Sequence, residues 1–421
     1  MYFGEWTALT SNDSAIAPQT RAARNNGLPE PARTGRQRRM PVPLPDDASV
    51  LLLPPDAAEV ACVARGVISA VAPQGGLTGL QQTLLAAMFH SLTGFDIDPL
   101  AVQADLADKP YGARDLAEDL HRRNAAFRGR IVQTMVTAEL VLDPLPSAVA
   151  SRVAEFAAEL SVHDDLEDVL LGHADSGRRL AAIDFDRNGY LHDFDIHHTQ
   201  HLHVGDNALT GPWTPVEDDP ALAARWASLG ELQAGTLGRG VHDFYKTRGF
   251  TFPGSPGSAP PLLAQHDWVH ILADYGTRVE SEIEIFAFIA RANDDLHAFS
   301  LLAMVLSLFE TGALATGAGL FQADRGHLSH PGMAVRFGDA LRRAALCTGS
   351  NDFMATDWFA IADKPVAALR KDLRLPPKSE QAVTAGSVGP WDAEGISPFQ
   401  LNAGRKLAAA EGREYTGPNP E

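Results

Sequence analysis

Cysteine is scarce in this chain of 421 residues, in which only Cys62 and Cys347 occur. Two thiols cannot supply the crosslinks of a disulfide-rich scaffold, and their scarcity fits a reducing cytoplasm. No apolar segment near the N-terminus resembles a signal peptide. We therefore expect a cytoplasmic protein, whose 45% hydrophobic residues allow a sizeable core and whose length predicts two or three domains.

Positive charge is also sparse, since 35 lysines and arginines face 53 acidic residues and the formal net charge is −18. A basic surface is needed to bind phosphates, and none occurs outside the N-terminal arm, so we expect no nucleic acid partner. That arm, residues 1–46, lacks hydrophobic periodicity and is predicted to be disordered. Its four arginines between Arg33 and Arg39 either contact anionic lipid peripherally, contact an acidic partner or remain solvated.

Long hydrophobic runs are missing as well. The strongly apolar segment from Phe299 to Phe309 stops at Glu310 and is shorter than the ~20 residues of a membrane span. It is either a core helix or part of a lipid-lined tunnel for an isoprenoid tail. The candidate tunnel residues are Phe286, Ile289, Leu302, Leu306 and Leu320. No Gly-x-Ser-x-Gly elbow and no Walker loop occurs, which disfavours hydrolase and nucleotide-dependent chemistry.

Helical periodicity is the main pattern that the chain does contain. Apolar residues recur at spacings of three and four residues, as on one face of a helix, in five segments separated by turn-forming residues. These segments are residues 57–71, 77–92, 113–127, 130–142 and 147–160. Residues 47–182 are therefore predicted to form a helical bundle, whose role the sequence leaves open. We expect a mostly α protein, in which this bundle precedes an α-helical metal-binding domain at residues 215–376 and an irregular tail at 377–421.

The metal prediction depends on four residues. His266, Asp267 and His270 lie within one short segment, and Glu282 follows His270 after eleven residues. The two histidines are four residues apart and therefore share one face of a helix, while Asp267 lies ~100° around the helix from His266. Asp267 is then either a third metal ligand, a residue that orients a histidine ligand, or a general base. We assign all four as metal ligands and as candidate catalytic residues, with zinc as the expected ion.

Two helices are predicted to carry these residues. Pro260-Pro261 suits the start of the first helix, and Gly276 suits its left-handed end. Thr277 and Glu280 match a capping box that starts the second helix, on which Glu282 is rotated ~200° from Glu280 and falls among apolar residues. A buried carboxylate there needs a partner. That partner is either a metal ion or the polar groups of the facing helix.

The spacing resembles the metal motif of the coenzyme Q biosynthesis protein four family, which reads His-Asp, two residues, His, eleven residues, Glu. Further segments of that family are similar in order over roughly residues 215 to 376. They are the Gly-Thr-Leu-Gly segment within Glu231–Arg239, the Thr-Gly element at Glu310-Thr311-Gly312, and the closing signature at Asp357-Trp358, Pro365, Ala368-Leu369-Arg370 and Leu373. Ser281 stands where the family usually has glycine, and Phe359 where it usually has glutamate.

The resemblance implies a metal-dependent oxidative decarboxylation of a quinone-like or prenylated aromatic precursor. It also implies other biosynthetic proteins as partners, and we expect a homo-oligomer. The alternative is a non-enzymatic scaffold that binds a prenyl lipid, with a purely structural metal. An open coordination position facing a cavity distinguishes the catalytic site from the structural one.

A second metal prediction concerns the linker, residues 183–214. Asp184, Asp186, Asn188, Tyr190 and Asp195 have the spacing of an EF-hand loop, so calcium is the expected ion. A β-hairpin with an Asn-Gly turn explains the same residues.

Four histidines follow in this linker. They can bind adventitious metal or find ordinary polar partners, and the second interpretation is preferred for His197, His198, His201 and His203.

Overall fold

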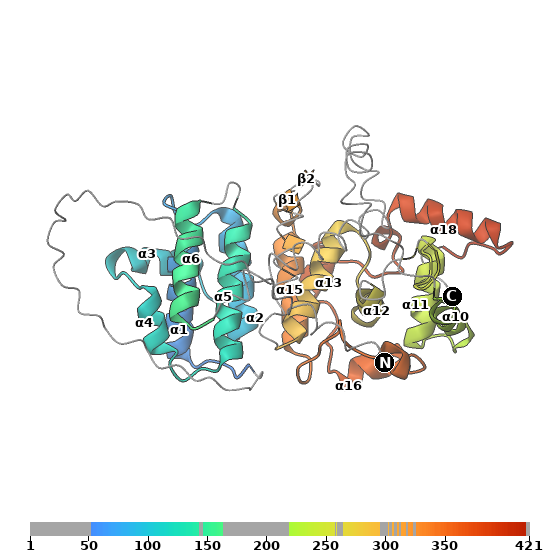
Figure 1. The fold of residues 1–421 in the computed structure, drawn as a ribbon, viewed down its shortest axis with the longest axis horizontal. Helices are drawn as coiled ribbons and strands as arrows, with labels where there is room; N and C mark the ends of the chain where they lie inside the picture. Colours follow the sequence, from blue (N-terminus) through green and yellow to red (C-terminus); the bar gives the residue numbers. More distant parts are fainter. Residues whose placement is uncertain are drawn as a thin grey trace, which may run out of the picture. The chain divides into compact units, whose positions relative to one another are not determined.

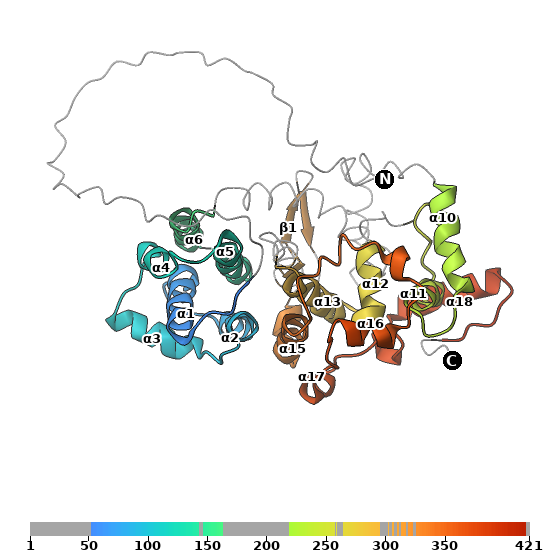
Figure 2. The same cartoon turned by 90° about the horizontal axis from the view of Figure 1, so that it is seen from below.

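The computed structural model describes residues 52–142, 146–162, 219–256, 258, 264–294, 302, 305–306, 310, 313–316, 319–322 and 326–417. Every described residue belongs to one compact unit, Val42–Glu421. This unit is mostly helical, as predicted (Figures 1 and 2).

The N-terminal helices are α1 (Ala57–Val71), α2 (Gly79–Thr93), α3 (Pro99–Asp108), α4 (Ala113–Asp119), α5 (Ala125–Leu140) and α6 (Ser147–Glu159). The C-terminal helices are α10 (Pro220–Ala227), η2 (Ser228–Glu231), α11 (Leu237–Arg248), α12 (Ala264–Ala273), α13 (Val279–Ala292), η3 (His327–Ser329), α15 (Met333–Ala345), η4 (Trp358–Ile361), α16 (Val366–Asp372), α17 (Glu380–Thr384), η5 (Ala393–Gly395) and α18 (Pro398–Ala410). A short antiparallel hairpin joins β1 (Ala313–Thr316) to β2 (Gly319–Gln322), with Thr316 opposite Gly319.

Local sequence signals explain the helix starts in the N-terminal part. Helix α1 has the predicted bounds, because Asp56 accepts hydrogen bonds from the first turn and Glu59 reaches back to the backbone of Asp56. The single helix predicted over residues 113–127 is wrong: α4 ends at Asp119, and Asn124 caps a new helix by accepting from the Phe127 amide. The sequence prediction also missed α3, which Asp98 caps.

Two hydrophobic clusters account for the core. One joins apolar residues of α1, α2, α4, α5 and α6, and the other centres on α11, α12, α13 and α15. The second also includes Leu84 and Met88 of α2, which packs against α15. Two arginines add polar contacts, since Arg130 of α5 donates to the carbonyl of Asn293 at 2.6 Å and Arg291 of α13 donates to that of Ser91 at 3.1 Å.

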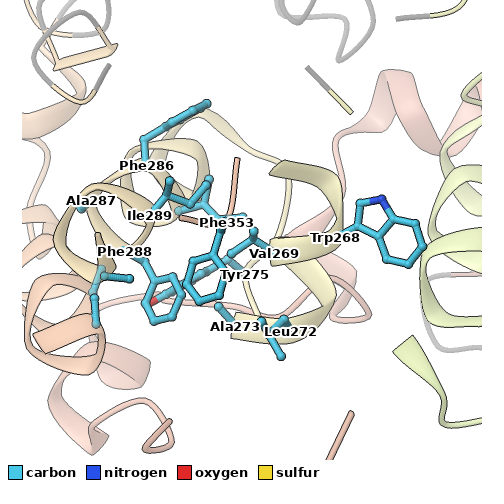
Figure 3. Close-up of a cluster of buried hydrophobic side chains, with 14 of the residues drawn as sticks. Trp268, Val269, Leu272, Ala273, Tyr275, Phe286, Ala287, Phe288, Ile289 and Phe353 are labelled. Carbon is cyan, nitrogen blue, oxygen red and sulfur yellow. The ribbon is translucent and has the colours of Figure 1, made fainter. Parts of the chain in front are cut away.

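Helix α12 lies between α11, α13 and α16 in the C-terminal part. Figure 3 shows Val269 of α12 beside Ile289 of α13 and Phe353, whereas Trp268 projects from the other side of α12. On that other side Trp268 stacks on Trp358 at 6.0 Å between ring centroids. Helix α12 is therefore apolar on both flanks, and this burial fixes the direction of its polar side chains.

The prediction of an irregular tail after residue 376 is wrong. Ser397 and Gln400 form a capping box with Pro398 in the first turn, and α18 runs for 13 residues. Helix α18 packs on α11 so closely that a Cβ atom on Gly404 would lie 1.9 Å from the carbonyl oxygen of Thr247. The sequence analysis overlooked this capping signal.

Candidate metal centre

The turn between α12 and α13 differs from the predicted one. Asp274 ends α12 with a left-handed φ of 67°, and the amide of Tyr275 donates to the carbonyl of His270 at 3.1 Å. Gly276 is not left-handed, so the prediction of its role is wrong. A Cβ atom on Gly276 would instead lie 2.6 Å from the Cα atom of Gly395, so glycine is required by close packing.

The predicted capping box at Thr277 is also wrong. Helix α13 starts after Arg278, and the Thr277 hydroxyl donates to the side chain of Gln400 at 2.6 Å. Glu280 does not reach back to Thr277, because its carboxylate accepts from His327 at 3.0 Å and from His330 at 3.1 Å. Partners from distant segments therefore replaced the local cap.

Three of the four predicted ligands, His266, Asp267 and His270, form a group that could hold a metal ion, and Glu282 lies beside the two histidines. Glu282 Oε1 lies 3.4 Å from His270 Nε2, and Glu282 Oε2 lies 3.7 Å from His266 Nε2. Asp267 Oδ1 lies 3.6 Å from His266 Nε2, and one ligand atom each from His266, Asp267 and His270 lies within 4.8 Å of the others. In a tetrahedral site with bonds of about 2.1 Å, neighbouring ligand atoms are about 3.4 Å apart. The side chains could therefore hold a metal ion with small adjustments.

Burial makes a cation at this site favourable. His266, Asp267 and His270 are 0% exposed and Glu282 is 1% exposed. Phe244 stacks on the His270 ring at 5.2 Å between centroids, and Phe286 lies 5.4 Å from the His266 ring. Carboxylates in such apolar surroundings are costly to bury, and a divalent cation compensates their charge. The donor set of imidazole nitrogens and carboxylate oxygens suits a divalent transition-metal ion.

The His270 ring is oriented for metal binding. Its Nδ1 atom lies 3.2 Å from the carbonyl oxygen of Tyr275, an acceptor that requires a proton on Nδ1. Burial, followed by the electrostatic effect of the neighbouring His266 side chain, lowers the pKa of His270 well below its usual value. The neutral ring then directs the lone pair of Nε2 towards Glu282, as a metal ligand requires.

Asp267 is held by a residue that the sequence analysis missed. The Tyr245 hydroxyl donates to Asp267 Oδ2 at 2.5 Å, while Asp267 Oδ1 faces His266. Tyr245 belongs to α11 and is 0% exposed. No motif marks this tyrosine, because the contact depends on how α11 packs against α12.

Comparison with known proteins gives no match to a family model, to a curated protein or to a solved structure. Within the described residues, no helix has both the length and the hydropathy needed to cross a membrane.

Two of the segments singled out in the sequence, within Glu231–Arg239 and at residues 357–373, lie around α11 and α12, whereas Thr311 and Gly312 lie outside the described residues. Thr236 caps α11, and the amide of Gly238 donates to the carbonyl of Ala362 at 2.8 Å. A Cβ atom on Gly238 would lie 2.9 Å from the Ala362 Cβ atom, so the second glycine allows this contact. Arg370 donates to the carbonyls of Leu272 at 2.7 Å and Ile271 at 3.0 Å, which satisfies the end of α12.

The two departures from the family pattern have structural partners. Phe359 packs edge-on against Trp226 at 5.5 Å, and the Arg225 guanidinium lies 3.9 Å from its ring centroid. Ser281 is fully buried, with its hydroxyl 3.5 Å from Arg336 Nη2. Neither residue is one of the four converging ligands.

Four of the five candidate tunnel residues are buried, and one of them, Phe286, lies beside the candidate metal centre. Phe286 and Ile289 are 8% and 6% exposed, and Leu302 and Leu306 are 0% exposed in the same hydrophobic cluster. The side chain of Leu320 lies outside the described part. Phe286 places an apolar side chain next to His266, and a tunnel through these residues stays a prediction.

The linker predictions lie outside the described residues. They concern the calcium ligands Asp184, Asp186, Asn188, Tyr190 and Asp195, the histidines His197, His198, His201 and His203, and the arginines of the N-terminal arm.

A second group with metal-binding residue types was not predicted. It consists of Glu280, His327 and His330. Burial alone would raise the pKa of Glu280, but hydrogen bonds from His327 and from the backbone lower this pKa to about 2. The long sequence separation between Glu280 and the histidines explains why spacing did not reveal the group.

Proposed function

We propose that His266, His270 and Glu282 bind one zinc ion, with Asp267 as a fourth ligand positioned by Tyr245. The observation that carries this proposal is the convergence of four buried side chains, in which three pairs of possible ligand atoms (His266–Asp267, His266–Glu282 and His270–Glu282) lie 3.4–3.7 Å apart. The neutral His270 ring and the carboxylate of Glu282 form the core of the donor set.

We propose further that this centre acts on a prenylated hydroxybenzoate or a related quinone precursor. Support comes from the motif spacing of the four ligands and from the apolar side chains beside them, since Phe286 contacts the His266 ring. A bound divalent cation can hold a ring carboxylate and a neighbouring phenolate oxygen and draw electron density from the ring. The residues of this chain then bind the prenyl tail and exclude water.

The burial of the ligands favours a second candidate function. With exposures of 0–1%, four protein ligands can close the coordination of the ion and leave no position for a substrate. In that case the chain is a non-enzymatic scaffold that binds a prenyl lipid and organises biosynthetic partners, and the metal stabilises the contact of α12 with α13.

Metal analysis of the purified full-length chain tests the centre. We expect about one tightly held equivalent of zinc, which His270→Ala removes because the variant loses a ligand that no neighbour replaces. The matched control is His242→Ala, which removes a partly buried histidine whose Nδ1 lies 2.9 Å from Asp243 Oδ1. Circular dichroism should show that α1–α6 stay folded, and retention of the tight zinc by His270→Ala would contradict the assignment.

An activity assay distinguishes the two candidate functions. The zinc-loaded chain is incubated with a prenylated hydroxybenzoate and dioxygen, because replacing a ring carboxylate with a hydroxyl group is a two-electron oxidation that needs an oxidant. Release of carbon dioxide that is lost on chelation and restored by zinc supports the enzyme. Co-purified prenyl lipid, identified by mass spectrometry, without any turnover supports the scaffold.

A further inference from the structure

A second convergence of ligand atoms lies at the start of α13. Glu280 Oε1 is 3.0 Å from His327 Nδ1 and 3.1 Å from His330 Nδ1, and the two imidazole centroids are 4.9 Å apart. Both rings thus direct the same nitrogen towards one carboxylate oxygen. These separations are slightly shorter than the ~3.4 Å between neighbouring ligands of a tetrahedral zinc site.

The histidines are positioned by contacts outside this group. Glu310 accepts from the amide of Leu328 at 3.0 Å and from the hydroxyl of Ser329 at 2.8 Å. The amide of Gly326 donates to the backbone carbonyl of Glu310 at 3.0 Å, and a φ of 79° at Gly326 turns the chain into η3. The turn that bears His327 and His330 is therefore held in place without the carboxylate of Glu280.

The group of Glu280, His327 and His330 is separate from the buried centre, which consists of His266, Asp267, His270 and Glu282. Glu280 and Glu282 are two residues apart on α13, so their side chains differ by about 200° in direction. The Glu282 side chain is 1% exposed, whereas that of Glu280 is 22% exposed and that of His330 is 48% exposed. A ligand can reach the second group from solvent.

We propose that Glu280, His327 and His330 form a second, solvent-accessible site for a divalent transition-metal ion, with zinc as the preferred ion and at least one position left to water. Two imidazole nitrogens and one carboxylate oxygen are a donor set that zinc favours, and three protein ligands leave its coordination open. The ion replaces the hydrogen bonds between the histidines and Glu280. It thereby joins the first turn of α13 to the segment that precedes α15.

Zinc titration against a chromophoric chelator tests this site on the full-length chain. His197, His198, His201 and His203 are first replaced with asparagine, so that the linker adds no equivalents. We expect two equivalents of zinc in this background and one after His330→Ala, which changes an exposed side chain and should leave the fold intact.

The matched control is His90→Ala. His90 is also exposed, at 43% for its side chain, and its Nδ1 lies 2.9 Å from Asp96 Oδ1, so it pairs with one carboxylate but lacks a second histidine partner among the described residues. This variant should keep two equivalents. Glu280→Gln should lose the second equivalent as His330→Ala does.

Cobalt gives an independent readout. When the buried centre is first filled with zinc, cobalt added to the second site should give visible absorption bands of a low-symmetry ion, which His330→Ala abolishes. A chain that binds only one equivalent, or that keeps two equivalents in both His330→Ala and Glu280→Gln, would overturn the proposal. Loss of one zinc equivalent in His270→Ala reports only on the buried centre of His266, Asp267, His270 and Glu282. The two proposed metal sites are therefore tested independently.

Discussion

The phenol of Tyr245 on α11 donates a hydrogen bond to Asp267 Oδ2 on α12, at 2.5 Å and with both residues 0% exposed. This contact leaves Asp267 Oδ1 directed at His266. A carboxylate held in this way does not have to be ordered when an ion binds, and such supporting groups affect metal affinity strongly. Tyr245 is therefore a positioning residue of the buried centre.

Tyr245→Phe should weaken zinc binding at the buried centre by about 10- to 100-fold, as loss of a group that orients a ligand typically does. The measurement is chelator competition at fixed pH. Tyr111→Phe is the matched control, because the Tyr111 hydroxyl donates to Asp119 Oδ2 at 2.6 Å in the N-terminal part. Equal zinc affinities for Tyr245→Phe and the unaltered chain would remove Tyr245 from this role.

Gly276→Ala should destabilise the fold by about 1–3 kcal/mol, because the added Cβ atom overlaps the backbone of another segment. The Gly395 Cα atom would lie 2.6 Å away, and backbone cannot move aside as a flexible side chain can. Gly75→Ala is the control, since a Cβ atom there meets nothing within 4 Å. Urea unfolding measures both variants, and similar midpoints would show that the turn tolerates a side chain.

Glu59 should make the stability of the N-terminal helices depend on pH. The hydrogen bond from Arg123 lowers the pKa of Glu59 below its ordinary value of about 4.5, and the two side chains are 2.5 Å apart. The stabilisation is therefore present above pH 4.5 and is lost as the pH falls through the lowered pKa. Arg123→Ala should destabilise the chain at neutral pH, and its difference from the unaltered chain should shrink below pH 4.5. A difference that is constant with pH would contradict this linkage.

Calcium binding to the loop of residues 184–195 stays a prediction that titration can test. If Asp184, Asp186 and Asp195 bind the ion, millimolar calcium should raise the melting temperature, since binding to the native state stabilises it. Asp184→Asn should abolish the rise. No heat of binding and no thermal shift would favour the hairpin interpretation.

The spacing of the main motif determined which residues meet. His266 and His270 share a helix face because they are four apart, and Glu282 points to the apolar side of the next helix, which required a partner for its charge. The mostly helical fold also follows from periodicity, and α1 has the predicted bounds, with Asp56 and Glu59 capping its start. Capping residues and apolar repeats act within a few positions, so the sequence by itself carries this information.

Only the tertiary structure decided the contacts between distant segments. Thr277 matches a capping box locally, yet its hydroxyl contacts Gln400, which lies 123 residues further along the chain. The packing of η3 against α13 likewise brings His327 and His330 within hydrogen-bond distance of the Glu280 carboxylate. A side chain takes the partner that packing brings within hydrogen-bond distance, and no local pattern encodes that choice when the partner lies far along the chain.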